Sequence, residues 1–478
     1  MSQAVIEPSG GSTTNPWTAF SVIAVAIYLT ILDLYIVNIA IPAIAADFSG
    51  SDLSSLSWVL TAYAVAFSAV LVPAGKLGDL YGRRRLFSIG LLVFVAGSAF
   101  SAVAGSLPFL IAGRVIQATG AGAMTPNSLG LALSLFPPGK RATVISAWGA
   151  IAGLGAASGP LAGSVLAAAD WRWIFVVNLP IGLAGFALLR RWTSEVRDPA
   201  ASGLPDVVGA AALAAASATL VLALSRGPSW DWDARFFAGL LAVAALSYVV
   251  FRRSSRHAVP IVELSLFRVR SFAAAMTSTG LLWAGYGAVL ASSSLFLTGS
   301  WRYSILRAGL ALAPGPAALA VVAAISGGLV IRFGATRMAT VGCALFTFGA
   351  LWQSAFIDGA ADYASAFLPA QLLIGIGVGL TLPTLVAIAL AEVPPTRFST
   401  GAAVFSTFRA IGSALGVAAW VATLGTEPIT AGQSFNTGWN LIAAFAALAT
   451  VACALTSVAP VPTKPAAFDT RTPQLQRG

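Results

Sequence analysis

Long apolar stretches dominate this chain of 478 residues and leave few ways for it to fold. A stretch of about 20 apolar residues crosses the hydrocarbon core of a bilayer as a helix, and such a helix satisfies its own backbone hydrogen bonds there. We therefore predict an all-α polytopic membrane protein with 14 transmembrane helices. The predicted spans cover residues 17–43, 54–74, 86–106, 108–134, 143–168, 173–192, 206–225, 235–252, 272–297, 305–331, 338–357, 363–391, 399–424 and 439–459.

The composition supports a membrane protein and argues against other classes. Apolar residues make up 58% of the chain and charged residues 9%, and the mean hydropathy is +0.85. The net charge of +10 is spread over short loops, whereas nucleic-acid binding needs basic residues on one water-facing surface. Cys343 and Cys453 lie inside apolar stretches, which indicates neither a metal site nor a disulfide framework. The first sixteen residues lack the basic flank of a signal peptide, so we expect the first span to be retained.

The loop GKLGDLYGRRR at residues 75–85 sets the predicted orientation. Lys and Arg in short loops are retained on the cytoplasmic side during insertion. With this loop inside, 20 of the 27 Lys and Arg residues fall in cytoplasmic segments and five outside, while Arg114 and Arg409 lie within spans. This predicts a multi-pass protein of the cell inner (plasma) membrane with both termini in the cytoplasm.

An internal repeat divides the chain. The pattern of Gly75 and Gly82 recurs 252 residues later at Gly327 and Gly334, although glycine-rich helices could also align by chance. Two parallel repeats around an axis normal to the membrane are typical of secondary transporters. We predict a cytoplasmic N-terminal tail (1–16), an N-terminal six-helix bundle (17–195), a two-helix insert (206–252), a C-terminal six-helix bundle (260–459) and a disordered cytoplasmic C-terminal tail (460–478).

Several motifs then identify a family. The loop matches the pattern G-x-L-x-D-x-x-G-R-[KR] at Gly75, Leu77, Asp79, Gly82, Arg83 and Arg84. LDLYIVNIAIP at 32–42 matches L-D-x-T-[IV]-V-N-[IV]-A-[LI]-P, except that Tyr35 replaces Thr. GLGAASGPLAGS at 153–164 matches G-x-x-x-G-P-x-x-G-G, except that Ser164 replaces the last Gly. Through these motifs the chain resembles the major facilitator superfamily, and within it the fourteen-span branch of drug:proton antiporters.

The resemblance implies a function and its partners. We expect a major facilitator fold that exports lipophilic drugs or antibiotics, cationic ones included, by alternating access and in exchange for protons. It implies no cofactor beyond the coupling proton, no metal, a small amphipathic substrate, the lipid bilayer as partner and a monomer as the working unit.

Two charges within spans are the candidates for proton coupling. Asp33 is the only carboxylate well inside a predicted span, and Arg114 lies at a similar depth in the fourth span. A charge in hydrocarbon costs several kcal/mol, about 2.5–3.5 on insertion scales, and usually marks a transport pathway. Burial would favour the protonated acid and a nearby Arg the ionised one, as proton exchange requires. The alternative is an ion pair that only holds the two spans together.

The loop and the fifth span carry the predicted gating elements. By resemblance, a cytoplasmic gate is formed by Gly75, Asp79, Gly82, Arg83 and Arg84, whose arginines could alternatively serve only as topology anchors. In the fifth span the predicted antiporter helix contains Gly155, Gly159, Pro160 and Gly163, and simple close packing is the other interpretation.

Amphipathic side chains within spans are the candidates for substrate contact, although core or lipid-facing packing is the alternative for each. They are Tyr35, Asn38, Tyr63, Gln117, Asn127, Tyr286 and Gln371.

Two other functions fit the sequence less well. A transporter of one metabolite, either an exporter or a proton symporter, could use the same fold. A polytopic enzyme would need a cluster of catalytic groups, but the single histidine, His257, lies alone in a basic loop. No G-x-x-x-x-G-K-[ST] loop is present, so we expect an ion gradient to supply the energy.

Overall fold

The computed structural model describes residues 15–48, 53–197, 206–227, 230–357, 361–391, 393–424 and 433–455. These residues are almost entirely helical and include no strand. The predicted C-terminal tail lies entirely outside the described residues. Of the predicted N-terminal tail, the structure describes only residues 15 and 16.

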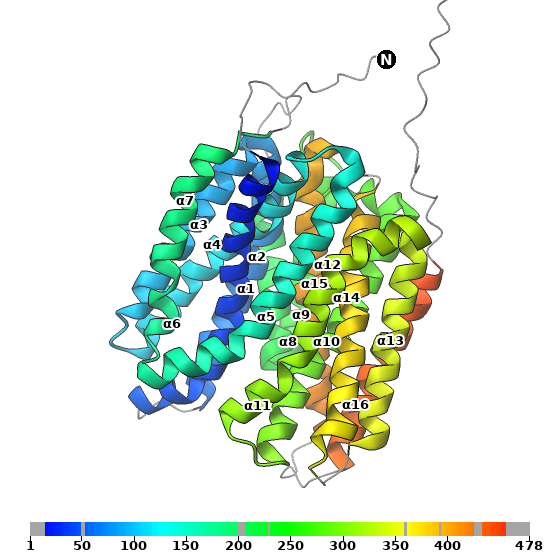
Figure 1. The fold of residues 1–478 in the computed structure, drawn as a ribbon. Coiled ribbons are helices and arrows are strands. Elements are labelled where there is room, and N and C mark those ends of the chain that lie inside the picture. Colours follow the sequence, from blue (N-terminus) through cyan, green and yellow to red (C-terminus); the bar gives the residue numbers. More distant parts are fainter. Residues whose placement is uncertain are drawn as a thin grey trace, which may run out of the picture.

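The helices follow one another with short connections (Figure 1). The first group is α1 (Pro16–Asp47), α2 (Leu53–Tyr81), α3 (Arg83–Ala102), α4 (Leu107–Ser134), α5 (Arg141–Ala169), α6 (Trp173–Val176) and α7 (Asn178–Trp192). The insert is α8 (Val207–Arg226) and α9 (Ala234–Ser254). The last group is α10 (Arg270–Gly299), α11 (Ile305–Leu312), α12 (Pro314–Phe333), α13 (Ala335–Phe356), α14 (Leu368–Leu390), α15 (Phe398–Leu424) and α16 (Gln433–Ala454).

Thirteen of the fourteen predicted spans coincide with segments that could cross a membrane, and the fourteenth, at 108–134, coincides with a long helix. Thirteen segments of the described chain are long and apolar enough to cross a membrane, with α11 and α12 forming one of them. The remaining long helix is α4, which has 28 residues and packs against both α2 and α3. This helix carries the buried polar residues Arg114 and Gln117. The protein is thus an all-α membrane protein.

The starts of several helices follow from local sequence. The Asn15 side chain accepts a hydrogen bond from the Trp17 N–H at 3.0 Å, and Pro16 occupies the first helical position. The Ser304 hydroxyl likewise accepts from the Arg307 N–H at the start of α11. Such caps satisfy N–H groups that the first turn of a helix leaves unpaired.

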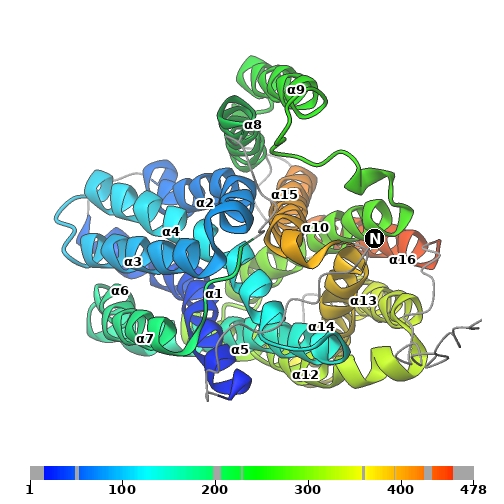
Figure 2. The ribbon, with the colours of Figure 1, turned by 90° about the horizontal axis from the view of Figure 1, so that it is seen from above.

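Two groups of helices lie side by side (Figure 2). Helices α1–α5 and α7 contact one another, and so do α10 and α12–α16; we call these groups the first half and the second half. Each contains a sharp turn between its second and third long helix, at Gly82 (φ 119°) and at Gly334 (φ 88°). Positive φ values favour glycine, so the repeated glycines have the same backbone role in both halves.

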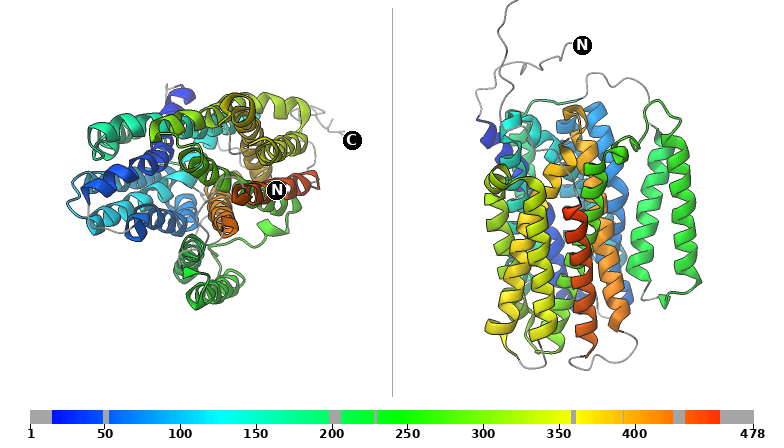
Figure 3. Two further views of the ribbon diagram at one scale, coloured as in Figure 1. Left: turned by 90° about the horizontal axis from the view of Figure 1, so that it is seen from below. Right: turned by 90° about the vertical axis from the view of Figure 1, so that its right-hand side faces the viewer.

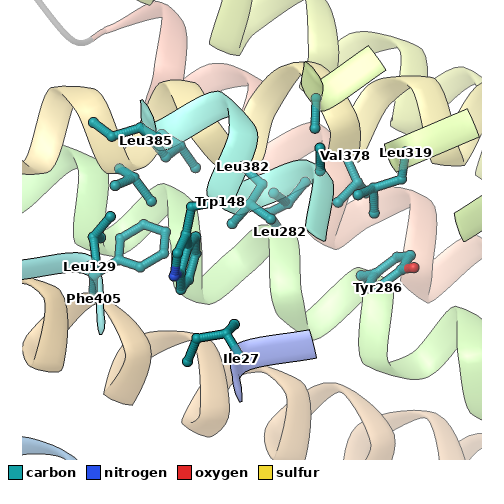
Figure 4. Close-up of a cluster of buried hydrophobic side chains, with 14 of the residues drawn as sticks. Ile27, Leu129, Trp148, Leu282, Tyr286, Leu319, Val378, Leu382, Leu385 and Phe405 are labelled. Carbon is teal, nitrogen blue, oxygen red and sulfur yellow. The ribbon is translucent and has the colours of Figure 1, made fainter. Parts of the chain in front are cut away.

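The halves meet along two seams, α5 against α12 and α2 against α15. A shared apolar cluster lies between them and includes Leu129 and Trp148 of the first half and Leu382, Leu385 and Phe405 of the second (Figure 4). All five lie in the parts of their helices nearest the Gly82 turn. We call that end of the molecule the basic face and the other end the opposite face; the apolar cluster holds the halves together near the basic face.

The insert stands at the edge of the molecule (Figure 3). Helix α8 packs against both α2 and α15, and thus covers the seam between the halves. Ala212 of α8 lies in one apolar cluster with Val72 of α2 and Ala403 of α15. Helix α9 packs on α8 and is exposed over most of its surface.

Asp206 holds the two ends of this insert together. Its Oδ1 accepts the Gly209 N–H at 2.9 Å, which caps α8, and also two hydrogen bonds from the Arg253 guanidinium at 2.8 and 3.0 Å. Asp206 is 1% exposed, and the pair therefore joins the start of α8 to the last turn of α9.

We expect Asp206→Asn to loosen the insert without unfolding the two halves. Asparagine keeps the helix cap but loses the charge-assisted bonds from Arg253, which are stronger than neutral ones. Amide hydrogen exchange at the paired ends of α8 and α9 should become faster. The exposed pair of Asp233 and Arg235, which also lies at a helix start, provides the control. Because exposed pairs add little, Asp233→Asn should change exchange less, and equal effects would contradict this account.

The same pair predicts a pH dependence. Burial raises the pKa of Asp206, but the hydrogen bonds from Arg253 and Gly209 outweigh it and hold the net pKa below the ordinary value of 3.8. A carboxyl group whose pKa is lowered in the folded state stabilises that state at pH values above its ordinary pKa. This stabilisation is lost as the pH falls through the lowered pKa. Opening of the insert, measured as exchange relative to the intrinsic amide rate at each pH, should therefore increase only at such acid pH, and Asp206→Asn should remove that step.

Candidate functional site

Asp33 and Arg114 form an ion pair inside the first half. Arg114 Nη1 lies 2.5 Å from Asp33 Oδ2, and both side chains are fully inaccessible. Gln117 Nε2 donates to Asp33 Oδ1 at 2.7 Å, and Asn178 Nδ2 approaches the same oxygen at 3.4 Å. Both amides also donate to the Ser98 hydroxyl, at 2.8 and 3.3 Å. Helices α1, α3, α4 and α7 thus converge on one carboxylate that is surrounded by donors.

The rest of the Arg114 guanidinium has no acceptor. Among the described residues, its Nε and Nη2 make no hydrogen bond, and neither does the Tyr63 hydroxyl. The guanidinium lies 4.2 Å from the centre of the Tyr63 ring and 5.8 Å from that of Phe175, which supplies cation–π attraction instead. Arg114 consequently depends on Asp33 for its only neutralising charge in the described structure.

The second half has a neutral counterpart of this cluster. Gln371 of α14 donates to the Ser293 hydroxyl of α10 at 3.1 Å, and Gln353 of α13 approaches the same oxygen at 3.4 Å. These helices follow the same order in their half as α4, α1 and α3 do in theirs. Among the described residues, an acid paired with an arginine is therefore present in the first cluster and not in this one.

Asp79 links the halves at the basic face. From the end of α2, its carboxylate accepts the N–H groups of Ser399 at 3.3 Å and Thr400 at 2.8 Å, and the Thr400 hydroxyl at 2.7 Å. These donors belong to the first turn of α15, where the unpaired N–H groups and the helix dipole attract an anion.

Arg83 completes this contact. It pairs with Asp79 at 2.8 Å and donates to the carbonyls of Gly130 at 3.0 Å and Pro395 at 2.7 Å. Its side chain is 1% exposed. We call Asp79, Arg83, Ser399 and Thr400 the Asp79 latch, because it joins α2 and α3 of one half to the start of α15 in the other.

The other predicted gate residues surround the latch. Gly75 lies so close to α15 that a Cβ there would be 2.6 Å from the Ser399 carbonyl oxygen. Gly82 forms the turn, and the side chain of Arg84 reaches the Thr193 carbonyl at 2.7 Å within the first half.

A second cross-link lies next to the latch. Lys76 Nζ of α2 is 3.0 Å from Glu263 Oε1, and the other oxygen of Glu263 pairs with Arg397, just before α15. Glu263 belongs to the segment between the insert and α10, and a cavity of about 750 Å³ opens beside it. Neither Lys76 nor Glu263 is among the site residues predicted from the sequence, and they lie 187 positions apart in the chain.

The glycines of α5 lie against α1. Gly155, Gly159 and Gly163 face that helix, and a Cβ at Gly159 would be 2.4 Å from the Cβ of Tyr35. Pro160 faces the second half, where a Cβ at Gly309 of α11 would be 3.0 Å from the proline. The predicted antiporter helix thus combines tight packing within its half with a contact to the other half.

The residues predicted to contact substrate are dispersed. Tyr63 and Gln117 belong to the Asp33 cluster, and Gln371 to its neutral counterpart. Asn127 is buried near the basic face, where it donates to the carbonyls of Ala74 and Ala123.

The remaining candidates are the exposed Asn38, the half-buried Tyr35 and the buried Tyr286. Tyr35 of the first half and Tyr286 of the second lie close enough to interact electrostatically. Tyr35 also interacts with Arg409 of α15, which was noted in the sequence as an intramembrane charge without a role.

Asp47 lies outside the spans, at the end of α1 on the opposite face, and binds Trp171 and Arg172. A hydrogen bond from the Trp171 indole at 3.1 Å and an ion pair with Arg172 at 2.9 Å lower the pKa of its carboxyl. Its side chain is 43% exposed, in contrast to Asp33 on the same helix.

Comparisons with known proteins agree with this architecture. The family model of the Major Facilitator Superfamily matches residues 23–417. The probable actinorhodin transporter of Streptomyces coelicolor is 32% identical over 84% of this chain and 71% of its own length. The multidrug resistance protein Stp of Mycobacterium tuberculosis is 34% identical over 82% of this chain and 73% of its own length.

A solved structure shares the fold at lower identity. The human organic anion transporter MFSD10 (TETRAN) superimposes with a TM-score of 0.67, covering 92% of this chain and all of the other, at 14% identity. The match over both halves, the helix arrangement and the two relatives lead to one conclusion. The chain belongs to the Major Facilitator Superfamily of membrane transporters.

Proposed function

We propose that the protein exports drugs or antibiotics across the plasma membrane in exchange for protons. The observation that carries this proposal is the sealed Asp33–Arg114 pair, which places a carboxylate deep inside a described span, whereas Asp79 lies near the end of its span. The relatives described above are a probable antibiotic transporter and a multidrug resistance protein, which supports export of such molecules.

The proposal assigns the basic face to the cytoplasm, as the distribution of Lys and Arg predicts. The Asp79 latch, the Lys76–Glu263 pair and the apolar cluster around Trp148 all lie toward that face. They support an assignment of this conformation to the state that is closed toward the cytoplasm.

The proton site can couple to conformation through Arg114. When Asp33 is ionised, it neutralises Arg114 and holds α1, α3, α4 and α7 together. When Asp33 gains a proton, Arg114 keeps its charge in a buried site without a counterion, which is strongly unfavourable. A rearrangement of the first half removes this unfavourable situation of Arg114. Binding of a proton therefore favours one conformation over the other.

The energy available is sufficient for substantial accumulation. One proton that moves down a potential of 100 mV releases about 2.3 kcal/mol. At about 1.4 kcal/mol per factor of ten, this supports a substrate gradient of roughly fifty-fold.

We predict that Asp33→Asn abolishes proton-driven transport but leaves slower exchange of substrate for substrate. Asparagine keeps hydrogen-bonding oxygen and nitrogen atoms at the site but cannot carry the proton. Uptake into inverted vesicles with an imposed proton gradient should fall to the background, whereas counterflow without a gradient should remain measurable but slower, because Arg114 has lost its counterion.

The control is Asp47→Asn, which changes an exposed carboxylate on the same helix and should leave both activities unchanged. Asp33→Glu, which retains an acid, should recover part of the coupling. Full proton-driven uptake by folded Asp33→Asn protein would rule out Asp33 as the proton carrier.

We predict that Asp79→Asn opens the basic face. The neutral side chain loses its ion pair with Arg83 and its attraction to the start of α15, interactions that only the closed state makes. Spin labels at the exposed residues Tyr81 and Phe333, one in each half, should shift toward longer distances. The native cysteines Cys343 and Cys453 are buried, which limits background labelling.

Thr400→Val tests the same contact from the other half, because it removes one hydroxyl donor and leaves both charges in place; a smaller shift is expected. Asp233→Asn in the insert is the matched control and should leave the distances unchanged. If Asp79→Asn leaves the distances and the transport rate as they are, the latch is only a topology anchor.

A further inference from the structure

Arg409 is a charge in the middle of the membrane without a counterion. It lies eleven residues into α15, which is about 16 Å from the start of the helix at the rise of an α-helix. None of the ion pairs in the described structure includes it. Its guanidinium lies 5.0 Å from the centre of the Trp283 ring, and it interacts with Tyr35 of the first half. An arginine at this depth is expensive and usually faces a substrate pathway.

Further unused donors surround this arginine. The Trp283 indole N–H and the Tyr286 hydroxyl are buried and have no hydrogen-bond partner among the described residues. Their rings meet edge to face, with centroids 5.3 Å apart, on the helix α10 that also packs against α15. Figure 4 shows Tyr286 at the border of the apolar cluster between the halves. Buried donors without acceptors are costly, so an acceptor supplied by a ligand would be favoured here.

Asp33 cannot serve as the opposite pole for a cationic substrate in this conformation. Its side chain is fully inaccessible, and its two oxygens already accept hydrogen bonds from Arg114 and Gln117. Of the charges described here, the Asp33–Arg114 pair is neutral as a unit, whereas Arg409 is half-buried and unpaired. The charge left without a counterion is therefore positive, and the Trp283 ring next to it packs edge to face on the ring of Tyr286.

We propose that Arg409 is the substrate-recognising residue and that the exported molecules are aromatic compounds carrying an acidic group, such as a carboxylate or a phenolate. A guanidinium binds such oxygens through charge-assisted hydrogen bonds, and the neighbouring rings pack against an aromatic scaffold. The inside-negative potential also drives an anion outward, whereas it opposes export of a cation. This inference rests on the proposed export function and narrows it to a class of substrate.

The test compares two xanthene dyes of opposite charge, anionic fluorescein and cationic rhodamine 6G. Uptake of each dye into inverted vesicles is measured for the full chain with an imposed proton gradient. We expect the unmodified protein to accumulate fluorescein in preference to rhodamine 6G. Arg409→Gln should raise the KM for fluorescein about tenfold or more, the loss expected for a hydrogen bond to a charged group. Arg409→Lys keeps the charge and should retain most of the uptake.

Two further variants keep the test informative if Arg409→Gln folds poorly. Trp283→Phe and Tyr286→Phe each remove one donor but keep an aromatic ring, and each should raise the KM for fluorescein severalfold. The control is Arg235→Gln, which removes an exposed arginine of the insert and should leave both dyes unaffected.

The possible results separate the two proposals. Preference for rhodamine 6G, or a KM for fluorescein that Arg409→Gln does not change, overturns the role of Arg409 while export itself stands. Failure of the unmodified protein to accumulate either dye counts against both the export function and the acidic-substrate class.

Discussion

The cost of an unpaired charge in hydrocarbon governs this structure more than any other constraint. Asp33 and Arg114 are tolerated inside the first half because each neutralises the other and Gln117 and Asn178 satisfy the remaining carboxylate oxygen. At the basic face the same rule applies to Asp79 and Glu263, whose partners come from both halves. Buried charges in the described structure are therefore paired, and the pairs at the basic face lie where the two halves meet. Arg409 differs because it belongs to none of these ion pairs.

The two halves use one backbone plan with different chemistry. Both make the turn between their second and third long helix at a glycine with positive φ, Gly82 or Gly334. Only the first places an acid and an arginine around that turn, since Ile331 and Ala335 occupy the corresponding positions in the second. The same contrast recurs inside the membrane, where Gln371 and Ser293 take the place of an ion pair. Repetition thus preserves helix geometry, while the acid–arginine pairs Asp33–Arg114 and Asp79–Arg83 occur in the first half and have no equivalent at the corresponding positions of the second.

Much of this arrangement can be predicted from the sequence, and the exceptions have a common physical origin. Span number and helical class follow from apolar stretches, because lipid leaves the backbone no alternative. The pairing of Asp33 with Arg114 follows from their similar depth and opposite charge. The contacts of Glu263 with Lys76 and Arg397 do not, because partners 187 and 134 positions away in the chain meet only when the halves are docked. Likewise, no local pattern distinguishes Asn127, which binds backbone carbonyls, from a residue facing the space between the halves.

The position of α8 has a mechanical consequence for the alternation of the halves. This helix rests on α2 and on α15 at once, so a separation of these two helices must either carry α8 with one of them or break its contact with the other. At the seam between α5 and α12, the helices that contact both are α14 and α11, which belong to the second half and not to the insert. The two lateral sides of the transporter are therefore unequal: the insert bridges the side formed by α2 and α15, whereas only helices of the two halves close the side formed by α5 and α12.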